Sequence, residues 1–153
     1  MRYAGRTLAA ALVSAAATVA VALFSAYRLA DAPIRGRLAG PDPIGTLAST
    51  IALVVALIAF YRLGRSIAAD AATARPAIVA GVLGGALAGL AGGGAQSVAL
   101  SDYLGAVLAG YAVPPEFLAI ALGAYVVVAT CAAAAVAAAI TYTAWHRAKA
   151  TIS

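Results

Sequence analysis

The sequence predicts an all-α fold: an integral membrane bundle of four transmembrane helices. Charged residues make up only 10% of the chain, against about 25% in ordinary soluble domains. Uncharged runs long enough to cross the roughly 30 Å hydrocarbon core of a bilayer occur four times. We therefore expect one transmembrane domain over residues 1–153, with helices at approximately 7–28, 43–62, 76–101 and 115–146.

The first apolar run, 7–27, contains 21 residues and follows Arg2 and Arg6. The apolar region of a signal peptide usually has about 7–15 residues, whereas this run is long enough to span a bilayer. We expect an uncleaved helix, and cleavage near residues 24–26 is the alternative. Small, weakly polar residues recur three and four positions apart, which predicts a stripe that faces protein: Thr7, Ala11, Ser14, Thr18, Ala22 and Ser25.

The second helix is expected to begin at Asp42 and Pro43, which supply an N-cap and a proline at the first helical position. A polar segment with turns, 28–40, precedes it. The helix is rich in Ile, Leu and Val, so we expect it to contact lipid. The next segment, 62–75, contains three arginines and Asp70 and predicts a short surface helix.

The third run, 76–101, holds seven of the fifteen glycines and no charged residue. Glycines repeat there every fourth residue, the spacing at which helix positions lie on one side. Interior glycine costs about 1 kcal/mol relative to alanine in water, but lipid enforces the helix and small residues then allow close approach of a second helix. The predicted packing face of this Gly-rich third helix, a glycine zipper, comprises Gly81, Gly85, Gly89, Gly92 and Gly93.

Gln96 is the only side-chain amide in a predicted span. An amide that faced lipid would be costly, so we expect it to point into the protein. There it either hydrogen-bonds a neighbouring helix or lines a small polar passage. The candidate polar site comprises Gln96, Ser97, Ser101 and Asp102.

The uncharged segment 103–115 has thirteen residues, too few to cross the bilayer as a straight helix. Three alternatives stay open: an interfacial segment, a re-entrant segment, or an extension of the third helix. Pro115 and Glu116 begin the fourth helix, and its uncharged run 117–146 has thirty residues, so it must tilt or project from the bilayer. A further small-residue stripe is predicted on this helix, at Gly123, Thr130, Ala137 and Thr141.

The distribution of Lys and Arg predicts the orientation, because cytoplasmic segments carry an excess of both. With both termini inside the cell, seven basic residues lie inside and three outside. The inner set is Arg2, Arg6, Arg62, Arg65, Arg75, Arg147 and Lys149, and the outer set is Arg28, Arg35 and Arg37. We therefore expect a multi-pass cell-membrane protein with both termini in the cytoplasm.

Few residues suit catalysis. His146 lies beside Trp145 near the inner end of the last helix and is interpreted as an interfacial side chain, and Cys131 as a small buried hydrophobe. None of the five carboxylates lies inside a predicted span, where coupled carriers usually hold ionisable residues. The sequence predicts no catalytic residue, cofactor or metal site, and no nucleic-acid partner because the arginines flank apolar segments.

The predicted function is that of a small membrane protein, not an enzyme, that acts through helix packing as a structural, accessory or regulatory component. Its expected partners are the lipid bilayer and, through small-residue helix faces, itself or another membrane protein. The alternative is a passive channel or small-solute transporter lined by Gly, Ser, Thr and Gln faces. A hydrated passage beside Gln96 and Asp102 would favour transport, and a closed small-residue interface would favour packing.

Overall fold

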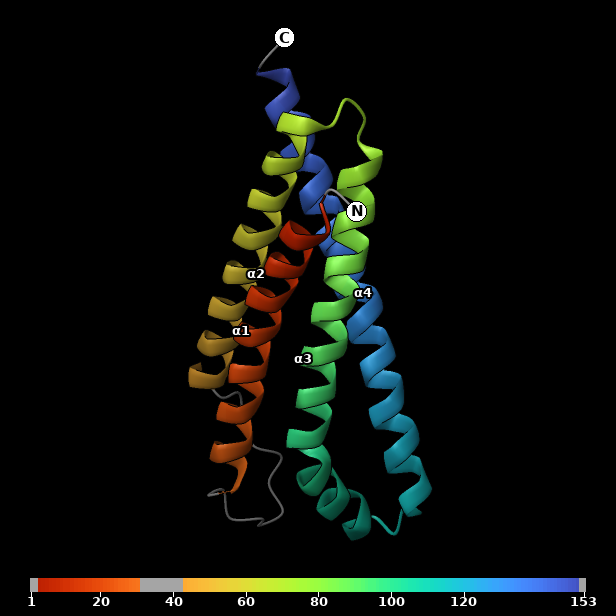
Figure 1. The fold of residues 1–153 in the computed structure, drawn as a ribbon. Coiled ribbons are helices and arrows are strands. Elements are labelled where there is room, and N and C mark those ends of the chain that lie inside the picture. The colour runs from red at the N-terminus through yellow and green to blue at the C-terminus, as the bar shows by residue number, and fades with distance from the viewer. Residues whose placement is uncertain (1–2, 31–42, 152–153) are drawn as a thin grey trace.

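The computed structural model describes residues 3–30 and 43–151, and within these ranges it contains four helices and no strand. The helices are α1 (Ala4–Ala30), α2 (Pro43–Asp70), α3 (Arg75–Gly110) and α4 (Pro115–Ala150) (Figure 1). All four are long and apolar enough to cross a membrane. The prediction of an all-helical chain with four candidate spans is confirmed for this part of the chain. The predicted N-cap residue Asp42 lies outside the described residues.

The helices form two antiparallel hairpins, α1–α2 and α3–α4, that pack side by side (Figure 1). α3 packs against α1 and α4, and α4 also packs against α2. The hairpins lie close together at the end that holds both termini and the α2–α3 connection, and they diverge toward the other end (Figure 1). We call these the closed end and the open end of the bundle.

α2 continues beyond its predicted end at residue 62 and reaches Asp70. The segment expected to be a separate surface helix therefore forms the last turns of α2. Ile67 is 0% exposed there and belongs to the hydrophobic core at the closed end, whereas Arg62 and Arg65 are exposed on the opposite face. The arginines favoured a surface segment in the sequence analysis. That prediction was wrong because charge on one face of a helix does not determine what the opposite face buries.

α3 continues through residues 103–110, so the structure shows the third alternative for the segment 103–115, an extension of the third helix. The turn that follows includes Ala112 with a φ of 54°, and α4 begins at Pro115. α3 has 36 residues, which gives a length of about 54 Å. This exceeds the roughly 30 Å hydrocarbon core, so α3 must tilt or project beyond it in a bilayer.

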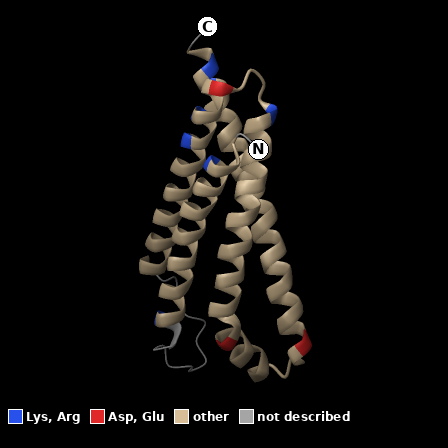
Figure 2. Cartoon of the chain, viewed as in Figure 1, with Lys and Arg blue, Asp and Glu red and all other residues tan. Residues whose placement is uncertain are grey.

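Charged side chains lie at the two ends of the bundle and leave its middle uncharged (Figure 2). At the closed end, Arg6 Nη1 of α1 lies 2.8 Å from Asp70 Oδ2 of α2 and donates a hydrogen bond to Ser66 O at 3.1 Å. Both charged side chains are partly exposed, and such pairs contribute only about 0–1 kcal/mol. This ion pair therefore aligns the ends of α1 and α2 and adds little to stability.

Candidate functional site

Four glycines of α3 meet α4 at a spacing of four residues: Gly81, Gly85, Gly89 and Gly93. A Cβ atom added to each would approach a Cα atom of α4. In that order, the four Cα atoms and their distances from the added Cβ atoms are those of Ala138 (2.6 Å), Ala134 (2.8 Å), Thr130 (2.8 Å) and Val126 (3.6 Å). Real Cβ atoms essentially never come within 3.0 Å of another heavy atom. The backbones of the two helices are therefore closer here than side chains at the first three positions would allow.

The two helices keep a constant antiparallel register, because each advances by four residues from one contact to the next. Ser97 extends this register by one step, and its Oγ donates a hydrogen bond to Leu122 O at 3.4 Å. The distance from the added Cβ atom to the Cα atom of α4 lengthens from 2.6 Å at Gly81 to 3.6 Å at Gly93, so the helices diverge toward the open end. Gly123, predicted to belong to the small-residue stripe of α4, accordingly has nothing within 4 Å of an added Cβ, whereas Thr141 of that stripe is fully buried.

A second small-residue face of α3 meets the α1–α2 hairpin. A Cβ added to Gly92 would lie 2.8 Å from Thr18 Cβ, and one added to Gly84 would lie 2.9 Å from Phe60 Cε1. Gly92 thus faces α1, unlike the four glycines with which it was grouped, because neighbouring positions point about 100° apart around a helix. The stripe predicted on α1 is confirmed in its buried members: Thr7, Ala11, Ser14 and Ala22.

Gly64 of α2 is an interface residue that the sequence analysis missed. A Cβ added there would lie 2.9 Å from Thr141 Cα and 2.8 Å from Ala144 Cβ of α4. Thr141 also lies against Gly81 of α3, so one residue of α4 packs between glycines of two other helices. The available signal was a lone glycine within a helical pattern, which costs about 1 kcal/mol relative to alanine.

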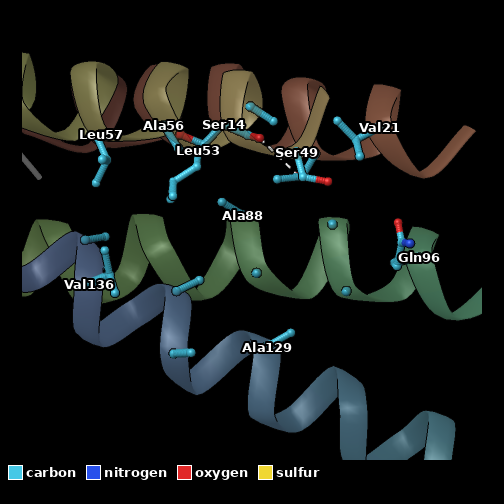
Figure 3. A pocket seen from close by; sticks show the side chains of 18 of the residues that line it. Ser14, Val21, Ser49, Leu53, Ala56, Leu57, Ala88, Gln96, Ala129 and Val136 are labelled. Carbon is cyan, nitrogen blue, oxygen red and sulfur yellow. Dashed lines mark hydrogen bonds between the residues drawn. The ribbon is translucent and has the colours of Figure 1, made fainter. Parts of the chain in front are cut away.

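A cleft of about 450 Å³ lies between the two hairpins and draws its walls from all four helices. In Figure 3, Leu53 and Leu57 point from the α1–α2 hairpin toward the α3–α4 hairpin. Most of the lining is Ala, Gly and aliphatic side chains, and none of the described lining residues is charged. The polar lining residues are Ser14, Thr18, Ser49, Gln96 and Tyr125. We call this space the inter-hairpin cleft.

Two of the four hydroxyl groups that line the cleft, those of Thr18 and Ser49, form hydrogen bonds within their own helices. Thr18 Oγ1 donates to Ser14 O at 3.1 Å, and Ser49 Oγ donates to Gly45 O at 2.9 Å. Ser14 is 1% exposed, and its Oγ has no partner among the described residues, which costs about 1–3 kcal/mol for a buried donor. Gln96 is half-buried at the cleft wall. No hydrogen bond involves its amide in the described ranges.

The four residues of the candidate polar site do not form one cluster. Gln96 lines the inter-hairpin cleft, whereas Ser97 is buried between α3 and α4. Ser101 Oγ donates to Val98 O of its own helix at 2.8 Å, and Asp102 is exposed. Successive positions on one helix point in different directions, so adjacency in sequence did not bring these side chains together.

Two side chains considered for chemistry lie on the outer surface of α4. Cys131 is exposed, so the prediction of a buried cysteine is wrong; it lies on the side of the helix away from α3. His146 is exposed and its ring centroid lies 6.1 Å from that of Tyr142. The described residues contain no group of three His, Cys, Asp or Glu side chains that could hold a metal ion.

In comparisons with known proteins, the chain matched no protein-family model, no curated protein and no solved structure.

Proposed function

We propose that the protein acts in a membrane through helix packing, as a structural, accessory or regulatory component, and that it performs no catalytic step. The observation that supports this most is the constant four-residue register of glycines between α3 and α4. Association of helices in lipid depends on van der Waals packing, which small residues make close. The glycine zipper is proposed to hold this hairpin rigid, so that its outer surface presents a fixed shape to a partner.

The outer surface of α4 carries a candidate partner face. Every fourth residue on it is small and exposed: Cys131, Ala135, Ala139 and Thr143. Stripes of this kind allow close approach of helices in membranes. We propose that a second copy of the chain packs here. Two copies with the same orientation in the membrane would bring their Cys131 side chains to the same depth.

Oxidative cross-linking in native membranes tests this partner face. The wild-type chain is expected to form a Cys131–Cys131 disulfide dimer, and Ala135→Leu is expected to abolish it because the larger side chain holds the helices apart. Ala20→Leu on the exposed side of α1 is the matched control and should leave the dimer unchanged. Equal cross-linking in all three chains, or in none, would contradict self-association through this face.

We also propose that both termini lie in the cytoplasm of a cell membrane. The seven-to-three excess of Lys and Arg supports this orientation, and Figure 2 shows acidic residues at the end opposite to the termini. In a Cys131→Ser background, a cysteine at Asp102 is expected to react with a membrane-impermeant maleimide in intact cells. A cysteine at Asp70 should react only after lysis, and the reverse pattern would refute the orientation.

The inter-hairpin cleft supports a second candidate function, passive transport of a small solute, because Gln96 lines it at the diverging end of the bundle. The packing proposal predicts no solute flux above that of protein-free liposomes. If the wild-type protein conducts and Gln96→Leu abolishes that flux without changing the thermal melt, transport is the better proposal. Ser101→Ala, outside the cleft, serves as the control.

A further inference from the structure

We infer that a groove between α2 and α4 binds an anionic phospholipid, with the lipid phosphate at Arg62 and Arg65. The groove has a volume of about 390 Å³, which falls within the roughly 300–1,000 Å³ of typical ligand pockets. Its described lining residues are Leu57, Ile58, Tyr61, Arg62 and Arg65 of α2 and Ile140 of α4. We call this space the arginine groove. Its occupant is a lipid, so the inference goes beyond the proposed packing function.

Two neighbouring cations line the arginine groove. Arg62 and Arg65 are three residues apart on α2, so their Cβ atoms lie about 5–6 Å apart on one side of the helix. Both arginines are exposed, and within the described ranges neither forms an ion pair or a hydrogen bond. Two like charges at this spacing repel each other. A phosphate bound between them would relieve this repulsion, because arginine binds phosphate oxygens through charge-assisted hydrogen bonds.

The two arginines lie at the depth of lipid headgroups. Arg62 follows nineteen uncharged residues of α2, 43–61, which as a helix are about 28 Å long and match a hydrocarbon core about 30 Å thick. Tyr61 also lines the groove, and tyrosine is enriched at the interface between membrane and water. A phosphate bound at Arg62 and Arg65 therefore lies level with the phosphates of the surrounding lipids.

The rest of the groove is apolar and lies on the membrane side of the arginines. Leu57 precedes Arg62 by five residues, about 7.5 Å further into the hydrocarbon core. Ile58 is 52% exposed, and Leu57 and Ile140 are half-buried. A soluble anion would contact the arginines alone, whereas a phospholipid also covers this apolar surface with the upper part of an acyl chain. Two cations above an apolar surface are therefore complementary to an anionic phospholipid.

A second copy of the chain is a poorer occupant of the groove. Most of the described Lys and Arg residues lie at the closed end (Figure 2), so an equally oriented copy would bring further positive charge to the arginines. Asp70, the described carboxylate at this end, is already paired with Arg6. Asp102 and Glu116 lie within about two turns of the α3–α4 connection, which is at the open end (Figure 1). The charge distribution therefore favours a lipid anion.

Photo-cross-linking in liposomes tests the arginine groove. The full chain is reconstituted in phosphatidylcholine with a trace of phosphatidylglycerol that carries a diazirine near the top of one acyl chain, and the labelled residues are mapped after irradiation. Labelling is expected to concentrate at Leu57, Ile58 and Ile140. A trace of phosphatidylcholine with the same diazirine should label these residues several-fold less, because its headgroup carries no net negative charge.

Two double variants with the same change in net charge separate the groove from the basic end as a whole. Each arginine near an anionic lipid contributes about a fivefold preference, so Arg62→Gln with Arg65→Gln is expected to lower groove labelling roughly 25-fold. Arg75→Gln with Arg147→Gln removes two exposed charges at the closed end outside the groove and should leave the labelling nearly unchanged. Thermal melts confirm that both double variants fold.

Four results would overturn the lipid site. Labelling spread evenly over the lipid-facing surfaces, or an equal loss in the two double variants, would mean that the basic end attracts anionic lipid without a specific site. Equal labelling by both lipid probes would contradict the preference for an anionic headgroup. Glycerophosphoglycerol, the same headgroup without acyl chains, is expected not to compete when added in excess, and competition by it would assign the groove to a soluble phosphate compound.

Discussion

Gly85→Leu is expected to lower the free energy of unfolding by about 1–3 kcal/mol, the usual cost of overpacking a close interface. A Cβ at Gly85 would lie 2.5 Å from Ala133 O and 2.7 Å from Ala137 Cβ of α4. The obstacles are backbone and a short side chain, neither of which can rotate away. Leucine therefore has to push the two helices apart over several turns. Reversible unfolding in mixed micelles measures the loss.

The matched control for this prediction is Gly94→Leu. Gly94 lies in the same helix, and nothing lies within 4 Å of a Cβ added there. If the glycines serve as flexible joints, leucine at either position should lower the free energy of unfolding. If Gly85 packs against α4, only Gly85→Leu should lower it. Gly85→Ala is expected to fall between wild type and Gly85→Leu, because even one carbon meets backbone at that site. An unchanged unfolding curve for Gly85→Leu would contradict the packing role.

Ile67→Ala is expected to destabilise the protein by about 2–4 kcal/mol, as large-to-small changes in packed cores do. Ile67 is 0% exposed and lies in the core at the closed end of the bundle, together with Phe60, Leu63 and Ala77. Truncation there leaves a cavity between packed helices that lipid cannot enter. The same unfolding experiment gives the difference in free energy.

Ile58→Ala is the control, since Ile58 belongs to the same helix and is 52% exposed. On the lipid-facing surface, the side chain has similar apolar surroundings in the folded and unfolded states, so its loss should change stability little. Similar losses for the two variants would mean that the last turns of α2 do not pack into the core.

The sequence by itself determined the features that depend on local composition. The four apolar runs were enough to predict four candidate spans, because a helix crosses lipid on its own length and hydrophobicity. Spacing along one helix also predicted the buried stripe of α1, since positions three and four apart share a face. The prolines at 43 and 115 matched the observed starts of α2 and α4 for the same local reason.

Only the tertiary structure decided which face meets which neighbour. Gly92 and Gly93 are adjacent, yet one faces α1 and the other α4. Gly64 and Ile67 are buried because α2 extends to Asp70 and packs there, a contact that no local pattern encodes. Cys131 is exposed and Gln96 lines a cleft for the same reason. The direction of a side chain follows from its own helix, but its surroundings follow from how four helices are arranged and where they diverge.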